Sequence, residues 1–523
     1  MNNNQIKPIP KEKFEFANIG EKLSDQKFDD KPISYFKDAW LRFRKNKASI
    51  VAAGIIIFIV LFSLVAPLCT FGRYDATFMD PYYAKMGPRN LTLSKIGIAT
   101  GAVSRDFNER GYMLQLAIGV GANGYDGETI STGDIDEKYN PILKLHEVRA
   151  NNITKNTTYV ADVDTYLEVG FIYRQIEKHE FDEIRAWEEK TGLHVLYPLI
   201  DTENEYYPLT LNPAKDNANY WYKAQGKLVP VDDNGNVIKY SENMTFVDNY
   251  KRDANGNLVY RVPVAASNAS LEQYKVRVLY YNYYMYKNGF EPEYLFGTDS
   301  QGYDLALRMA IGIRLSLLVA ITVSVINFII GALYGAIEGY YGGTTDIVME
   351  RIAEILGGIP FIVLATLFQI HFAQKLGAIP SLLFAFVMTG WLGTAGRVRT
   401  QFYRFKNQEY VMAARTLGAR DRRIIWKHIF PNSLGTIITS SALVIPSVIF
   451  SESMLSFLGI VSLGGSGMTS LGTLLSEASS IWENYPHLMI FPALIISLLM
   501  ISFNLFGNGL RDAFNPSLRG VED

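Results

Sequence analysis

Glu409–Asn432 is the segment of this chain best suited to recognising another protein. It reads EYVMAARTLGARDRRIIWKHIFPN, which predicts a helix, a glycine break and a second helix between two apolar runs. Ala413 and Ala414 are small enough for another protein's surface to approach closely. Gly418 can end the first helix in a left-handed conformation, and Pro431 marks the entry to the next apolar run. The segment predicts a docking site; an ordinary amphipathic loop between membrane helices is the alternative.

No catalytic motif is recognised in the sequence. His179-Glu180 has no second His at metalloprotease spacing, and no Ser/His/Asp or Cys/His motif stands out. No G-x-x-x-x-G-K-[ST] loop occurs, so the chain cannot cradle ATP phosphates by that route. We therefore expect no catalytic residue, metal or cofactor in this chain, and no nucleic acid among its partners.

Six apolar segments predict an α-helical polytopic membrane protein, because a helix needs about 20 mainly apolar residues to cross a bilayer. The segments that qualify or nearly qualify are Ala48–Leu68, Ser316–Ile337, Ile355–Phe372, Ala378–Ala395, Ile437–Leu458 and Leu488–Phe506. Four residues inside these segments are predicted to produce kinks or to allow close packing of helices: Gly331, Pro360, Pro446 and Pro492.

Three polar residues also lie inside the apolar segments: Asn327, Gln369 and Asn504. Each either lines a transport path or forms a hydrogen bond between helices. The sequence does not decide between these two interpretations.

Lys and Arg near the ends of the spans set the orientation. They cluster before the first span (Lys37, Arg42, Arg44, Lys45, Lys47), between the fourth and fifth (Arg397, Arg399, Arg404, Lys406, Arg415, Arg420, Arg422, Arg423, Lys427) and after the sixth (Arg511, Arg519). With six spans, all three places fall on one side, which the rule assigns to the cytoplasm. The acidic Glu338–Glu354 connection falls on the same side and is a local exception to the rule that cytoplasmic loops are positively charged.

Residues 72–296, between the first and second spans, are therefore expected outside as an α+β insert. Glu177–Lys190 reads as a helix that stops at Gly192, and His194–Tyr197 reads as a strand. Two near-copies, Asp232–Ile238 and Asp253–Val259, contain Asn-Gly and predict hairpin turns. A calcium loop is the alternative, although no Glu follows at the EF-hand position.

The run Tyr274–Tyr286 is dense in tyrosine. A packed strand returning to the membrane is the favoured interpretation, and a recognition surface is the alternative. We expect the folded insert to contact another protein on that side of the membrane or to cover the outer end of the spans, with Tyr280–Tyr286 near the membrane-proximal side. A scaffold role is the alternative.

A turn and an interfacial amphipathic helix are predicted just before the second span. The residues that define this pre-span signature are Gly297, Asp299, Gly302, Asp304, Arg308, Gly312 and Arg314. The arginines can reach lipid headgroups or pair with the aspartates.

The pre-span signature closely resembles the C-type membrane subunit of oligopeptide/dipeptide ABC permeases, with Tyr303 where that family usually has Arg. Glu409–Asn432 resembles the EAA loop of the same proteins, although Met412 and His428 depart from its pattern. Four further stretches agree: Phe36–Lys47, Gly339–Gly343 with Asp346 and Arg351, Glu452–Gly459, and Asn504–Asp512 with Asn508 where Asp is usual. The resemblance covers about Phe36–Leu68 and Gly297–Pro516, and leaves out most of the insert.

The resemblance implies a membrane subunit of a type I ABC importer in a bacterial cytoplasmic membrane. A cytoplasmic tail (1–47) precedes the first transmembrane helix (48–71), and a core of five spans (297–510) contains the coupling loop (396–432) and precedes a cytoplasmic tail (511–523). The implied partners are a homologous permease, two cytoplasmic ATPases that hydrolyse ATP, an extracellular binding protein, a peptide and membrane lipid. The residues implied in coupling are Glu409, Ala413, Ala414, Arg415, Gly418 and Pro431.

Other functions stay open at this stage. The alternative to an oligopeptide or dipeptide as the solute is another small molecule, such as a nickel chelate. An ion-driven transporter would need paired ionisable groups deep in the spans, where charges are nearly absent. A membrane-anchored enzyme or sensor would leave the docking segment unexplained.

Overall fold

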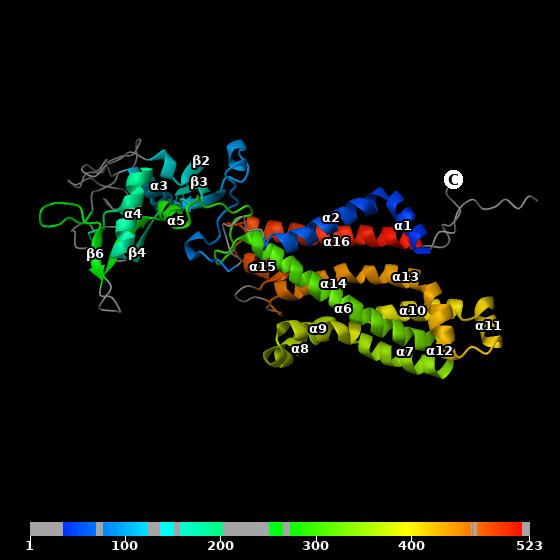
Figure 1. The fold of residues 1–523 in the computed structure, drawn as a ribbon. Helices are drawn as coiled ribbons and strands as arrows, with labels where there is room; N and C mark the ends of the chain where they lie inside the picture. Colours follow the sequence, from blue (N-terminus) through cyan, green and yellow to red (C-terminus); the bar gives the residue numbers. More distant parts are fainter. Residues whose placement is uncertain are drawn as a thin grey trace, which may run out of the picture.

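The computed structural model describes residues 35–68, 77–123, 136–150, 157–201, 250–264, 272–461, 463 and 468–514. They form a long helical bundle with a smaller region of helices and strands at one end (Figure 1). The predicted turn at Asp232–Ile238 lies outside these residues, as do Cys69 and most of both tails.

The first span packs against the last one. Helix α1 (Tyr35–Lys45) leads into α2 (Lys47–Val65), whose first turn is capped by the Asn46 side chain, which accepts from the Ser49 amide. The Ser49 hydroxyl donates to the Leu505 carbonyl (3.1 Å) on α16 (His487–Phe514). A Cβ at Gly509 would lie 1.9 Å from that hydroxyl, so this crossing depends on a residue without a side chain.

Helix α6 (Leu305–Tyr341) runs unbroken for 37 residues through the centre of the bundle (Figure 1). The prediction of a separate interfacial helix before the second span is wrong. Asp304 caps α6 by accepting from the Ala306 amide, and the next break is Gly342, at φ 68°. Because nothing between them interrupts the backbone hydrogen bonds, the signature and the span share one rigid rod.

Helix α6 packs most extensively on α10 (Leu392–Phe405) through glycines spaced four apart. A Cβ at Gly331 would meet the Trp391 carbonyl at 2.8 Å, and one at Gly335 would meet the Ala395 carbonyl at 2.2 Å. Such small residues allow two membrane helices to approach closely. The predicted packing role of Gly331 is confirmed.

Two of the predicted spans are bent. Helices α7 (Gly343–Gly357) and α8 (Phe361–Leu376) meet at 71°, so the segment predicted as a span over Ile355–Phe372 is not one straight helix but crosses a break after Gly357. The segment Gly357–Pro360 explains the break, because Pro disfavours helical backbone at the residue before it. Helices α13 (Phe430–Ala442) and α14 (Val444–Phe457) meet at 44°.

The number of spans agrees with the prediction once the bent pairs are counted. Four helices or helix pairs are long and apolar enough to cross a membrane, Lys47–Val65, Leu305–Tyr341, Ala378–Phe405 and His487–Phe514, and the two bent pairs raise the number to six. Ala378–Phe405 comprises α9 (Ala378–Gly390) and α10. The short helix α15 (Leu471–Ala478) packs between α14 and α16.

The insert contains two antiparallel sheets. The first has the order β1 (Ala102–Asn108), β3 (Thr157–Asp164), β2 (Ile142–Ala150) and carries α3 (Glu109–Asn123). The second joins β4 (Phe171–Glu177), β7 (Gln273–Leu279) and β5 (Leu196–Tyr197), with β6 (Arg261–Val264) also paired to β7. Short 3-10 helices lie at Pro81–Tyr83, Leu93–Ile96 and Glu137–Tyr139.

Local predictions within the insert are confirmed. Helix α4 (Lys178–Thr191) ends at Gly192, which has φ 70°. A turn joins Arg252 to Leu258, and the Asp253 carboxylate accepts from the amides of Asn255 and Asn257.

The tyrosine run is a correction to the prediction. Only its first part is strand; Tyr280–Asn288 form helix α5. Tyr280, Tyr281, Tyr283 and Tyr284 are buried in the insert's core, and the Tyr280 hydroxyl donates to Asp80 (2.5 Å). Apolar and polar residues do not alternate along the run, because its aromatic residues lie all around a helix and not on one face of a strand. The cluster is therefore scaffold, and these four side chains do not form a recognition surface.

Candidate functional site

The predicted docking segment begins with helix α11 (Glu409–Thr416). Gly418 follows at φ 81°; its amide donates to the Arg415 carbonyl, and the Ala419 amide donates to the Ala414 carbonyl. These two bonds form a Schellman cap, in which a left-handed residue satisfies the last carbonyls of the helix. A Cβ at Gly418 would meet no atom within 4 Å. Glycine is therefore required by the left-handed backbone conformation and not by a lack of space.

Helix α11 has a buried side and a bare side. Val411 is buried in a cluster with Ile424 and Phe402. Ala413 is exposed, Ala414 is half-buried, and Leu417 at the tip is 88% exposed. Glu409 opens the helix, where a carboxylate is favoured by the helix dipole. The helix thus presents small and apolar side chains to whatever lies beyond it.

The second helix of the segment differs from the simple helix predicted. It begins as α12 (Asp421–Arg423), widens into a π-helical stretch (Ile424–Ile429) and continues as α13, with Pro431 in the first turn. Single π-helical turns occur frequently at functional sites. Sequence patterns do not reveal this turn, because its apolar residues fit an α-helical face as well.

One tyrosine connects the docking segment to α6. The Tyr340 hydroxyl donates to Asp421 (2.5 Å) and accepts from Arg415 (3.3 Å). These contacts tie the last turn of α6 to both helices of the segment. The sequence analysis did not single out Tyr340, because its partners lie 75 and 81 positions away.

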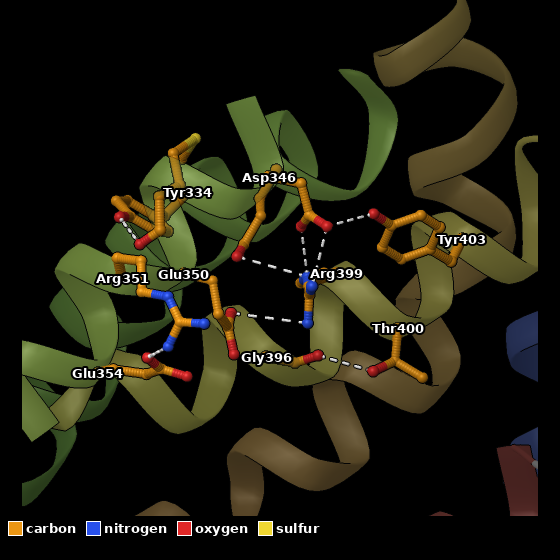
Figure 2. A network of polar contacts seen from close by, with 11 residues as sticks. Tyr334, Asp346, Glu350, Arg351, Glu354, Gly396, Arg399, Thr400 and Tyr403 are labelled. Carbon is orange, nitrogen blue, oxygen red and sulfur yellow. Dashed lines mark hydrogen bonds and ion pairs between the residues drawn. The ribbon is translucent and has the colours of Figure 1, made fainter. Parts of the chain in front are cut away.

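Beside this contact, one arginine faces three carboxylates. Arg399 on α10 forms a bidentate pair with Asp346 (2.6 and 2.9 Å), and lies 3.4 Å from Glu338 and 3.6 Å from Glu350. The Tyr403 hydroxyl also donates to Asp346 (2.6 Å), as Figure 2 shows. This Arg399 cluster holds α6, α7 and α10 together, and charge-assisted bidentate bonds of this kind are among the stronger ones.

The Arg399 cluster explains the local exception in the charge pattern. Glu338, Asp346 and Glu350 belong to the acidic connection expected in the cytoplasm, and Arg399 belongs to the basic loop on the same side. The two segments neutralise each other in part. Each was visible in the sequence, but their pairing depends on the packing of α6 against α10.

At the other end of α6, the pre-span signature forms a joint with the insert. Arg308 Nε lies 3.1 Å from Asp299, and the two side chains are 3% and 2% exposed. The Tyr303 ring lies over the Arg308 guanidinium at 4.9 Å, so the exchange of Arg for Tyr leaves this pair intact. The Thr298 hydroxyl accepts from the Met86 amide and donates to the Tyr83 carbonyl, which fastens the insert to the signature.

Glycines let the chains of the joint approach closely. Gly297 and Gly302 have φ of 81° and 95°, and a Cβ at each would lie 2.2 Å and 2.0 Å from the carbonyl oxygens of Met86 and Asp80. Gly312 packs on the start of α15, and Arg314 donates to the Ser63 carbonyl on α2 (3.2 Å). The signature therefore joins the insert, α2, α6 and α15.

Two carboxyl groups of the joint have pKa values raised above the ordinary value for aspartate. Burial raises the pKa of Asp304 to about 6, against the opposing effect of the Ala306 and Leu307 amides. Burial also raises the pKa of Asp80, which the hydrogen bond from Tyr280 partly offsets.

The three polar residues predicted for a pathway do not come together. Asn327 is buried on α6 against Gly390, and Gln369 donates to the Ala378 carbonyl (2.9 Å) between α8 and α9. Asn504 is exposed on α16. Among the described residues no hydrogen bond joins the three. The contacts of Asn327 and Gln369 favour helix packing.

Known proteins resemble the two parts of the bundle. Residues 331–520 match the model of the binding-protein-dependent transport system inner membrane component, and residues 34–88 match the N-terminal TM domain of oligopeptide transport permease C. These two matches leave residues 89–330 between them.

Three relatives cover similar lengths. The oligopeptide transport system permease protein OppC of Bacillus subtilis (strain 168) is 39% identical over 43% of this chain and 73% of its own. The dipeptide transport system permease protein DppC of the same strain is 41% identical over 43% and 70%. OppC of Haemophilus influenzae (strain ATCC 51907 / DSM 11121 / KW20 / Rd) is 44% identical over 44% and 72%.

The apolar spans, the capped docking helix and these matches define a multi-pass permease subunit of an ABC importer. The chain belongs to the family of binding-protein-dependent transport system inner membrane components, alongside the C-type permeases OppC and DppC.

Proposed function

We propose that this chain forms one half of a peptide import path and couples it to cytoplasmic ATPases through α11. The observation that carries the proposal is the bare face of α11: small residues and Leu417 are held outward by a buried anchor and a glycine cap. An apolar, exposed tip of this kind favours a protein partner. The complete importer would contain a second permease, two ATPases and an extracellular binding protein.

The docking role is tested by matched substitutions in the reconstituted transporter. Gly418→Val places a β-branched residue in left-handed backbone, at a cost of at least about 1–2 kcal/mol, whereas Asn tolerates that conformation better. Gly418→Val and Ala414→Trp should insert in the membrane but lose ATPase association and transport. Gly418→Asn and Ala414→Ser should keep both, and normal uptake by the first pair would refute the assignment.

The peptide substrate is supported by the names of the relatives and is tested by uptake. Membrane vesicles with the full importer should accumulate a labelled dipeptide or oligopeptide when ATP is supplied. A nickel chelate tested in the same vesicles separates the alternative solute class. Accumulation of the chelate and not of any peptide would leave the permease assignment intact and overturn the peptide proposal.

The proposed orientation places both tails and the docking segment in the cytoplasm of a bacterial cell, with the insert outside. In a Cys69→Ser background, Asn234→Cys should react with an impermeant thiol reagent on intact cells, whereas Arg404→Cys should not. Lysed cells provide the control, because both cysteines should then react. The reverse pattern on intact cells would overturn the orientation.

A further inference from the structure

A cationic hollow lies at the end of the bundle that carries the docking segment, which the function proposed above places in the cytoplasm. It has a volume of about 540 Å³ and is lined by Arg420, Arg422, Arg423, Trp426 and Lys427. All five residues are exposed. They belong to the docking segment but follow α11, and the coupling contact proposed above is made by α11 and not by these side chains.

The cations of the hollow are not neutralised within the chain. Across the described ranges, no ion pair involves any of the four. The single acidic residue in the stretch, Asp421, accepts a hydrogen bond from Tyr340. An open hollow with four free positive charges favours an anion with several oxygen acceptors, for which guanidinium groups provide paired donors.

The hollow lies where a candidate membrane span begins. Four of its five residues lie in the first two turns of a helix, Asp421–Thr439, that forms the first half of a bent candidate span, and Arg420 directly precedes that helix. At a rise of about 1.5 Å per residue, Lys427 is within about 10 Å of the start of that helix. Trp426 packs against Phe430 (ring centroids 5.0 Å apart), and exposed Trp is enriched where the membrane meets water.

We propose that this hollow binds the headgroup of an anionic phospholipid of the cytoplasmic leaflet. The arginines and Lys427 hold the phosphate, and Trp426 lies against the upper part of the acyl chains. Clusters of basic residues directly cytoplasmic of a membrane helix attract anionic lipid in this way. A bound lipid anchors the base of α13 beside the coupling helix, so the lipid composition of the membrane affects how firmly the docking segment is held.

An acidic surface of the ATPase is the competing occupant, and the geometry disfavours it. Figure 1 shows α11 farther out from the bundle than α12. An ATPase that binds the exposed Leu417 and Ala413 would contact α11 before it reached the hollow. The residues of the hollow lead directly into the membrane helix.

The test uses the fluorescence of Trp426 in the assembled transporter, with its ATPases bound, in nanodiscs. The signal of Trp426 is the difference between the natural chain and Trp426→Phe. Nanodiscs of phosphatidylcholine receive the same mole fraction of either brominated phosphatidylglycerol or brominated phosphatidylcholine, since bromine quenches nearby tryptophan. We expect clearly stronger quenching by the brominated phosphatidylglycerol.

Two double variants show whether the hollow causes this preference. Arg422→Gln/Arg423→Gln should weaken it by up to about fivefold for each neutralised cation, as for single basic residues at an anionic membrane. Arg44→Gln/Lys47→Gln removes the same charge from another exposed place on the cytoplasmic side and should leave the preference unchanged.

Each remaining outcome overturns the proposal. Equal quenching by the two lipids, in the presence of bound ATPases, means that no lipid occupies the hollow or that the ATPase covers it. Equal losses in both double variants mean general attraction of anionic lipid to a positive surface. If millimolar inorganic phosphate abolishes the preference, the hollow is a site for free anions rather than for a lipid.

Discussion

The two ends of α6 hold their neighbours in opposite ways. At the insert end, Arg308 forms an ion pair with Asp299, and both side chains are almost fully buried; Glu477 also acts on this pair electrostatically. At the docking end, Arg399 meets three carboxylates, and its side chain is 29% exposed. The first arrangement has one stable geometry. In the second, one cation is shared by three carboxylates and is partly open to water, so Arg399 can change partners more easily than Arg308 can.

This difference indicates how a rigid helix can take part in a transporter that changes conformation. Helix α6 is unbroken from the joint to Tyr340, so a displacement at one end is carried to the other. The tight end fixes the insert to the rod, whereas the loose end leaves room for α7, α10 and the docking segment to rearrange. Three substitutions test the comparison.

The largest effect is expected at the buried pair. Asp299→Asn keeps an oxygen for the amides of Gln301 and Tyr303 but removes the ion-pair partner of the buried Arg308. Breaking a buried pair in this way costs about 3–5 kcal/mol in the free energy of unfolding. Asp299→Asn/Arg308→Met removes both charges and should be more stable than Asp299→Asn in thermal unfolding of the detergent-purified chain. A double variant that loses more than the single one would contradict the account of this joint.

A smaller effect is expected at the Arg399 cluster. Arg399→Ala removes the cation shared by Asp346, Glu338 and Glu350, but Asp346 keeps its hydrogen bond from Tyr403 and Glu350 is 39% exposed, which offsets part of the loss. We expect a decrease of about 1.5–3 kcal/mol, the usual contribution of hydrogen bonds to charged groups. Arg404→Ala on the same helix is the control and should have little effect. If Arg399→Ala destabilised the chain more than Asp299→Asn, the contrast between the two ends would be wrong.

The smallest effect on stability is expected at Tyr340. Tyr340→Phe keeps the ring and removes the contacts with Asp421 and Arg415, which should cost about 0.5–1.5 kcal/mol. Coupling should suffer more, because these contacts link α6 to the docking segment. The measurement is the number of solute molecules imported per ATP hydrolysed in proteoliposomes. Tyr341→Phe, on the exposed neighbour, is the matched control. An unchanged ratio in Tyr340→Phe would show that the link carries no coupling.

The sequence predicted those features that depend on neighbouring residues. The glycine cap after Ala414, helix α4 with its stop at Gly192 and the six apolar segments each follow from local spacing. The first helix of Glu409–Asn432 and its glycine break were predicted for the same reason, because the small residues, the glycine and the proline lie within one short stretch.

Features that depend on distant residues were missed. The Arg399 cluster and the Tyr340 contact join positions 49 to 81 apart, and no periodicity reveals such pairs. The bend at Gly357–Pro360 and helix α5 were misread for another reason: apolar and aromatic composition identifies burial but not the direction of the chain. The run Tyr274–Tyr286 was predicted as a packed strand, with a recognition surface as the alternative, because tyrosine suits both buried and exposed environments.

The most direct test of the central claim is photo-crosslinking from the tip of the docking helix. Leu417 is replaced by p-benzoylphenylalanine in cells that express the whole transporter, and Leu143, exposed on β2 of the insert, is replaced in a parallel strain. The account predicts that the probe at 417 crosslinks to an ATPase subunit and that the probe at 143 does not. A probe at 417 that captures no ATPase, or that captures the extracellular binding protein, would contradict it.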